Sequence, residues 1–234
     1  MKSIHLIDKG SLILSFNKSG STLFVNTLKL FLNWKGIPIS SEFKGDGKVI
    51  IGLIRNPIDR FFSGFLHFYE DTIERNTLTQ GPTIDYLLPK MESWIEGFHD
   101  NSEDPHYQRQ GDILKGLGVT PTHLYKIESI GDEIGRIGNW EYPSQIPDLG
   151  SNKPLCLLGE LPLFTTLGIP LTHWDWQVFI GFYESVSRSL KQHHRGEDTL
   201  ILKAVTEFHR PDLMRKIISL MEGDMKRFDY TQMI

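Results

Sequence analysis

The chain has 234 residues, of which 39% are hydrophobic and 23% are charged, and its formal net charge is −4. This composition is typical of a globular protein with a sizeable core, and the length favours one domain over two. The acidic balance argues against bulk electrostatic binding of DNA or RNA, so we expect no nucleic-acid partner.

The cysteine count and the hydropathy pattern limit the kinds of site and the cellular location that we expect. Cys156 is the single cysteine, which excludes an intrachain disulfide and a cysteine-rich zinc site. Asp8 and Lys9 interrupt the first apolar run, so no signal-peptide pattern is present. No run reaches the roughly 18 to 20 apolar residues that span a bilayer. We therefore expect a bacterial or viral cytoplasmic protein without a membrane span, or a chain from which an anchor was removed.

The first elements are predicted to be a hairpin and a helix. "SLILSF" (11–16) is a nearly continuous apolar run, which indicates a buried strand, and "IHLI" (4–7) predicts a partner strand across the turn 8–10. A helix follows, with Gly36 as its stop. Its apolar residues at helical spacing are Phe24, Leu28, Phe31 and Leu32.

A second strand and helix come next. "KVIIGLI" (48–54) predicts another buried strand. Asn56 can cap the helix after it, and Pro57 suits the first helical turn. One apolar face of that helix consists of Phe62, Phe65, Leu66 and Tyr69. A third strand is predicted over 122–128, and alternating strands and helices are typical of an α/β fold with a parallel sheet.

The last part of the chain combines an irregular stretch with helices. Prolines and glycines recur from 141 to 170, which predicts an irregular excursion that covers a site on its acceptor side. Two or three helices follow, the last over 211–228, and for Trp174 and Trp176 we expect core packing rather than stacking on a sugar. We interpret residues 1–234 as a single domain.

The polar loop in "SFNKSGSTLF" (15–24) indicates an anion site. The first N–H groups of a helix lack partners and carry partial positive charge. Gly20 lets the backbone approach a ligand closely, Lys18 adds a full charge, and hydroxyl groups add donors. The candidate loop residues are Asn17, Lys18, Ser19, Gly20, Ser21 and Thr22. The alternative is a solvated, capped turn. The Walker pattern is absent, since the lysine precedes the glycine.

A second anion-binding site is predicted after the second strand. In "LIRNPIDRFFSGF" Arg55 follows a buried strand, and Ser63 lies eight residues on, inside a helix. Arginine binds phosphate bidentately, and a serine hydroxyl adds a donor. Both loops lie at carboxyl ends of parallel strands, where such folds bind ligands. Arg60 is interpreted as structural or solvent-facing, with a contact to the cofactor as the alternative.

Together these motifs resemble the sulfotransferases that use 3′-phosphoadenosine-5′-phosphosulfate (PAPS), in their carbohydrate-type branch. "FNKSGSTL" is similar to the family's 5′-phosphosulfate loop, and "RNPIDRFFSGF" to its 3′-phosphate motif. "DPHYQRQGDIL" (104–114), "LYKIESI" (124–130) and "ISLMEGDMKRFDY" (218–230) resemble later segments. The resemblance implies a three-layer α/β sandwich with a central parallel sheet and a P-loop-like phosphosulfate-binding loop.

The same resemblance implies an enzyme that transfers a sulfuryl group from PAPS to an acceptor hydroxyl, with carbohydrate as the expected acceptor and 3′-phosphoadenosine 5′-phosphate (PAP) as product. Lys18 would contact the bridging oxygen and 5′-phosphate, and Arg55 and Ser63 would hold the 3′-phosphate. The leaving group is a stable phosphate, so no metal is required.

Two residues compete for the role of general base. Glu42 lies 24 residues after Lys18, a spacing that resembles the glutamate-type branch, and its alternative is an exposed loop acid. His106 is the rival base or an acceptor contact, with a structural role as its alternative. Two other functions stay open: a P-loop kinase or nucleotide phosphotransferase, and a non-catalytic nucleotide-binding module.

Overall fold

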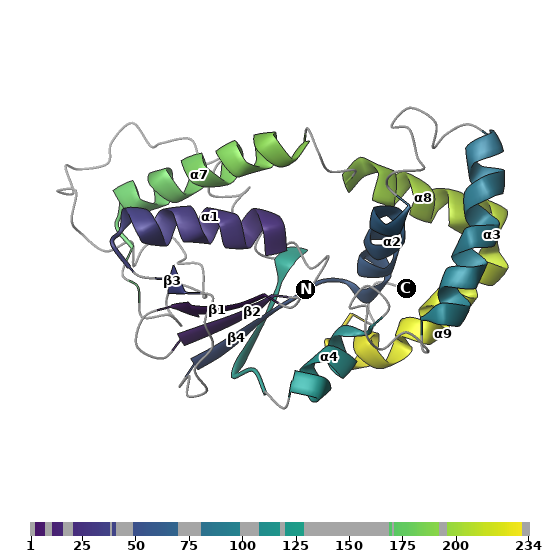
Figure 1. The fold of residues 1–234 in the computed structure, drawn as a ribbon, viewed down its shortest axis with the longest axis horizontal. Coiled ribbons are helices and arrows are strands. Elements are labelled where there is room, and N and C mark those ends of the chain that lie inside the picture. Colours follow the sequence, from purple (N-terminus) through teal and green to yellow (C-terminus); the bar gives the residue numbers. More distant parts are fainter. Residues whose placement is uncertain are drawn as a thin grey trace.

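The computed structural model describes residues 3–7, 11–15, 21–37, 39–40, 49–69, 81–98, 108–117, 120–128, 169, 171–191 and 196–230. Within these ranges the protein is a mixed α/β structure (Figure 1). The strands are β1 (Ser3–Ile7), β2 (Ser11–Ser15), β3 (Ile39–Ser40), β4 (Val49–Ile54) and β5 (His123–Lys126). The helices are α1 (Ser21–Trp34), α2 (Pro57–Phe68), α3 (Gly81–Gly97), α4 (Gln110–Leu117), α7 (His173–Lys191), α8 (Gly196–His209) and α9 (Pro211–Arg227).

The five strands form one sheet in the order β3-β1-β2-β4-β5. β2, β4 and β5 run parallel, which confirms the parallel sheet predicted from the three strands. β1 pairs antiparallel with β2, as the predicted hairpin requires, and with the short β3, which the sequence did not predict. The sheet is therefore mixed, with a parallel half and an antiparallel edge.

Helix boundaries follow local chemistry. The side chain of Asn56 accepts hydrogen bonds from the N–H groups of Ile58 at 2.9 Å and Asp59 at 3.4 Å, and Pro57 opens α2, which confirms the predicted cap. After α1, Gly36 has a φ of 70°, a conformation that glycine adopts without the steric penalty of a side chain, as its predicted role at the end of the helix requires.

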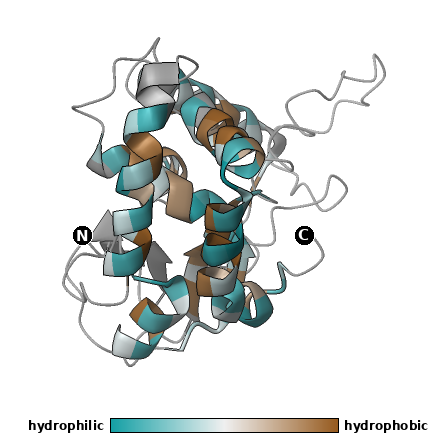
Figure 2. Cartoon of the chain, turned by 90° about the vertical axis from the view of Figure 1, so that its right-hand side faces the viewer, coloured by the Kyte–Doolittle hydropathy of each residue, from teal (hydrophilic) through white to brown (hydrophobic). Residues whose placement is uncertain are grey.

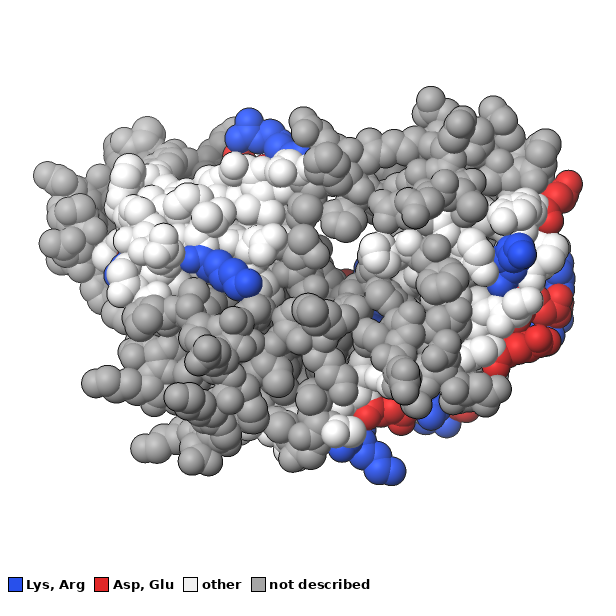
Figure 3. Space-filling view, viewed as in Figure 1, with Lys and Arg blue, Asp and Glu red and all other residues white. Residues whose placement is uncertain are grey.

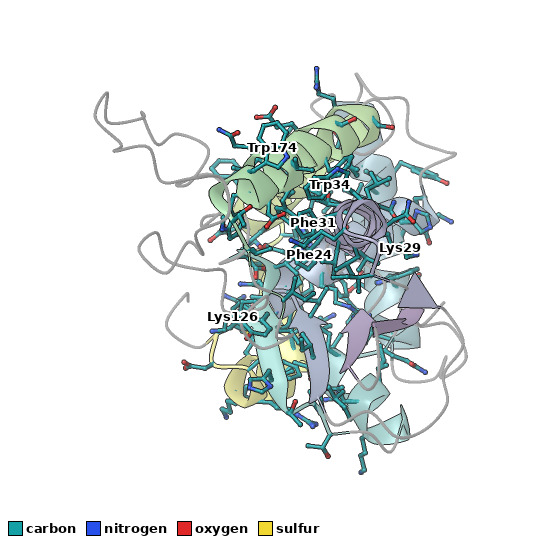
Figure 4. All side chains as sticks on the ribbon, turned by 90° about the vertical axis from the view of Figure 1, so that its left-hand side faces the viewer. Phe24, Lys29, Phe31, Trp34, Lys126 and Trp174 are labelled. Atoms are coloured by element: carbon teal, nitrogen blue, oxygen red, sulfur yellow. The ribbon has the colours of Figure 1, made fainter. Side chains whose placement is uncertain are left out.

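Two apolar clusters fill the interior, and β4 contributes to both. Ile51 and Leu53 pack into the cluster between the sheet, α1 and α7, whereas Ile54 belongs to the cluster among α2, α3, α4, α8 and α9. Phe31 of α1, which is labelled in Figure 4, packs edge to face on Phe179 of α7, with ring centroids 5.4 Å apart. Hydrophobic residues lie between the helices and hydrophilic ones along their outer faces (Figure 2). Successive β4 side chains point alternately into the two clusters. This strand therefore joins the cluster that contains α1 and α7 to the cluster that contains α2, α3, α4, α8 and α9.

The predicted helical faces are confirmed. Phe24, Leu28, Phe31 and Leu32 of α1 are buried, as are Phe62, Phe65 and Leu66 of α2, while Tyr69 is partly buried against the same cluster. Trp176 is in the core, but Trp174 is 58% exposed, so the expectation of core packing for both tryptophans was wrong for Trp174. Among the described helices, none is long and apolar enough to cross a membrane.

Candidate functional site

The carboxyl ends of β2, β4 and β5 meet at one edge of the sheet. Ser15, the last residue of β2, lies in register with Leu53, and Lys126, the last residue of β5, lies in register with Ile54. Arg55 follows directly after β4. The ends of β2 and β4 therefore lie side by side at the edge where parallel sheets bind ligands.

Of the predicted loop residues, two lie in the described part of the chain. Ser21 and Thr22 are the first two residues of α1, so the start of this helix agrees with the predicted strand–loop–helix order. Asn17, Lys18, Ser19 and Gly20 lie outside the described residues, and so do Glu42 and His106. Their assigned roles in donor binding and catalysis stay predictions.

The Arg55 backbone is held on both sides. Its N–H donates to Gln110 Oε1 at 3.0 Å, and its carbonyl accepts from Gln110 Nε2 at 2.7 Å. The next N–H, that of Asn56, donates to Glu128 Oε1 at 2.7 Å. Since α4 and the residues just after β5 supply these partners, the position of Arg55 is determined by segments distant in the sequence.

The Arg55 side chain lies in a region of negative charge. Burial lowers the pKa of its guanidinium, and the negative charges of Asp59 and Glu128 act in the opposite direction. Burial strengthens charge-assisted hydrogen bonds from this guanidinium, because the local dielectric is low, whereas the two carboxylates compete with an incoming anion for it.

Ser63 is half-buried in α2, one turn after Asp59 on the same helical face. Asp59 in turn accepts from Lys203 of α8 at 2.8 Å. This face of α2 therefore carries a hydroxyl group and an ion pair, and the charge of Asp59 acts on Arg55. Lys203 is a cation that sequence reasoning missed, because nothing in its own surroundings in the chain relates it to α2.

Arg60 has a structural role, one of those that the sequence left open for it. It is buried, and its Nη1 donates to the carbonyl of Gln108 at 2.7 Å. Burial lowers the pKa of Arg60 to about 10, against the opposing effect of the Asp224 carboxylate, so the group is still protonated at neutral pH.

The C-terminal helix supports the same region. Asp224 of α9 accepts from the N–H of Gln110 at 2.6 Å and from the N–H of Gly111 at 3.0 Å, which caps α4. Beyond the helix, Tyr230 donates its hydroxyl to Glu128 Oε2 at 2.9 Å. Lys126 lies over the Tyr230 ring at 4.3 Å and donates to the Asp229 carbonyl at 2.6 Å.

Elsewhere on the described surface, charged side chains form ion pairs with one another. Along the edge formed by α3 and α9, acidic and basic side chains alternate (Figure 3). There Glu92 accepts from Lys216 at 3.1 Å and lies 3.6 Å from Arg210. These pairs join α3 to α9 at the surface and define no binding site. Among the described residues, no group of three or more potential metal ligands occurs.

Comparison with known proteins yields no relative. No family model matches the chain, and neither a curated protein nor a solved structure matches it. The function must therefore be argued from the residues themselves.

Proposed function

We propose that the protein is a PAPS-dependent sulfotransferase that transfers a sulfuryl group to an acceptor hydroxyl, with carbohydrate as the proposed acceptor. One observation carries the proposal: Arg55 leaves β4 beside the carboxyl end of β2, the strand that leads into the lysine- and glycine-containing loop. Two anion grips at one sheet edge suit a ligand with two separated phosphate groups. The finer architecture, a three-layer sandwich with a P-loop-like loop, belongs to the same proposal.

Each candidate residue has a separate role in the proposed reaction. Lys18 would neutralise charge that develops on the bridging oxygen, and the loop from Asn17 to Thr22 would donate N–H and hydroxyl groups to the 5′-phosphate. Arg55 and Ser63 would bind the 3′-phosphate. Glu42 or His106 would accept the proton of the acceptor hydroxyl. The departing phosphate is stable, so this chemistry needs no metal.

The test is calorimetric titration of the wild-type chain with adenosine 3′,5′-bisphosphate, adenosine 5′-monophosphate and magnesium ATP. We expect the bisphosphate to bind most tightly. Arg55→Gln should weaken the bisphosphate by roughly 10- to 100-fold, which corresponds to the loss of a charge-assisted hydrogen bond, and should leave the monophosphate nearly unchanged. Arg215→Gln is the matched control, because Arg215 is exposed on α9.

Other outcomes separate the alternatives. Preferential binding of magnesium ATP without a preference for the 3′-phosphate would favour a nucleotide phosphotransferase. Bisphosphate binding without turnover, across a screen of acceptor hydroxyls, would favour a binding module. Equal affinity for the bisphosphate and the monophosphate would contradict the proposal.

A further inference from the structure

The hydrogen bonds around Thr122 determine which way the β4 backbone points. The N–H of Ile50 donates to Thr122 Oγ1 at 2.9 Å, and its carbonyl accepts from the Thr122 N–H at 2.8 Å. Ile50 therefore directs both backbone groups toward the β5 side. Successive residues of a strand direct these groups to opposite sides, so Arg55 directs its own toward β2. The bond from the Asn56 N–H to Glu128, on the β5 side, agrees with this.

Gln110 occupies that β2-facing position. The paired residues of β2 and β4 end with Ser15 opposite Leu53. Two residues beyond Leu53, just after β4 ends, the Gln110 amide bonds both backbone groups of Arg55, at 3.0 and 2.7 Å, as a neighbouring strand would. Gln110 is fully buried, and Asp224 fixes its own N–H at 2.6 Å. The Gln110 side chain thus supplies the hydrogen bonds that a further residue of a neighbouring strand would make. It does so at the point where β2 ends and the candidate anion loop begins.

We propose that Gln110 is a positioning residue for 3′-phosphate recognition: its amide holds the Arg55 peptide unit at the sheet edge, so that the guanidinium is presented to the ligand. This inference rests on the proposed function, since Arg55 must bind the 3′-phosphate for its position to matter. It adds a contribution from α4, and through Asp224 from the C-terminal helix, to a 3′-phosphate site otherwise assigned to Arg55 and Ser63.

The decisive variant is Gln110→Met, which keeps the length of the side chain and removes its amide. The control is Thr206→Val. Thr206 is also fully buried and polar, and its hydroxyl donates to the Leu202 carbonyl at 2.7 Å within α8 and contacts Met91 Sδ of α3. Both variants should lower Tm. The readout that separates them is the ratio of affinities for adenosine 3′,5′-bisphosphate and adenosine 5′-monophosphate.

We expect Gln110→Met to lower this ratio by about tenfold or more, as the loss of a well-placed charge-assisted contact would, while Thr206→Val leaves it unchanged. Amide hydrogen exchange at Arg55 should accelerate in Gln110→Met alone. Should Gln110→Met not accumulate as folded protein, Gln110→Asn tests the same point, since its amide is one methylene too short to reach both groups.

The outcomes distinguish the two claims. A wild-type chain without preference for the bisphosphate would overturn the proposed function, and this inference with it. A wild-type preference that survives unchanged in the Gln110 variants would overturn the inference alone. A lowered ratio in Thr206→Val of the same size would also overturn it, because general destabilisation would then explain the effect.

Discussion

Lys35 Nζ lies 2.8 Å from Asp175 Oδ1, and this ion pair joins the end of α1 to the start of α7. The Asp175 carboxylate is almost fully buried, whereas Lys35 is partly exposed. Burial alone would raise the pKa of Asp175, but the hydrogen bonds from Lys35 and Thr172 outweigh it and lower that pKa. The Thr172 N–H donates at 2.6 Å.

The first prediction is that Lys35→Gln lowers the free energy of unfolding at pH 7 by about 1–3 kcal/mol, because a buried carboxylate loses its cation. A carboxyl group with a lowered folded pKa stabilises the fold above its unfolded pKa of about 3.9, and this contribution is lost as the pH falls through the folded pKa. Urea unfolding should therefore show a difference between variant and wild type that shrinks toward pH 3.

The control for this prediction is Lys226→Gln, which removes an exposed i,i+4 pair with Glu222. Such pairs contribute less than about 0.5 kcal/mol. A difference for Lys35→Gln that is no larger than this, or that grows as the pH falls, would contradict the assigned role of the Lys35–Asp175 pair.

The second prediction concerns the cap of α2. Asn56→Ala should lower the free energy of unfolding by about 1–2 kcal/mol, since two N–H groups of the first turn lose their acceptor. Asn56→Ser keeps an acceptor at the cap and should recover most of the loss. Chemical denaturation of both variants measures this, and equal losses would show that the cap does not depend on the side-chain oxygen.

That cap shows how much of the fold was predictable. The signals at Asn56 and Pro57 are local, and the apolar spacing of α2 lies within a few turns. Local signals of this kind predicted the β1–β2 hairpin, the parallel strands and the helices that precede and follow them. The expectation for Trp174 and Trp176 was wrong because residues two apart on a helix point about 200° apart, so only one of them could face the core.

The candidate site was less predictable, because its contacts are long-range. Arg55 was recognised from its own motif, but its Gln110 partner lies 55 positions away, and the Asp224 that caps Gln110 lies 114 positions further on. Gln110 opens a helix in a polar segment, where nothing local distinguishes it from a solvated glutamine. Glu128 and Tyr230 lie in segments that the resemblance included, yet the hydrogen bond between them required the fold to bring the C-terminus back to β5.

The third prediction tests the contact between Tyr230, which follows α9, and Glu128, which follows β5. Tyr230→Phe keeps the ring under Lys126 and removes the hydroxyl that donates to Glu128. Burial and the neighbouring Glu128 charge raise the pKa of Tyr230, so the hydroxyl is a donor throughout the ordinary pH range. We expect a loss of about 1–2 kcal/mol in the free energy of unfolding. Tyr86→Phe, at an exposed tyrosine of α3, should change it little.

Thermal unfolding followed by near-ultraviolet circular dichroism measures both variants. The loss in Tyr230→Phe should be insensitive to salt, because a buried hydrogen bond is screened far less than an exposed ion pair. If Tyr230→Phe and Tyr86→Phe unfold at the same temperature, the Tyr230–Glu128 hydrogen bond contributes nothing to stability.

The last prediction compares two glycines of α4. A Cβ at Gly111 would lie 2.6 Å from Asp224 Oδ1 and 3.2 Å from Arg227 Nη1, whereas a Cβ at Gly116 would meet nothing within 4 Å. Alanine is favoured over glycine in a helix by up to about 1 kcal/mol, so Gly116→Ala should stabilise the protein by about 0.5 kcal/mol near the helix end. Gly111→Ala should instead destabilise it by about 1–3 kcal/mol. Asp224 cannot withdraw from the new methyl group without breaking its hydrogen bonds to the N–H groups of Gln110 and Gly111.

Opposite signs in parallel urea titrations would establish that α9 approaches the start of α4 as closely as these contacts require, and equal stabilisation by both substitutions would contradict it.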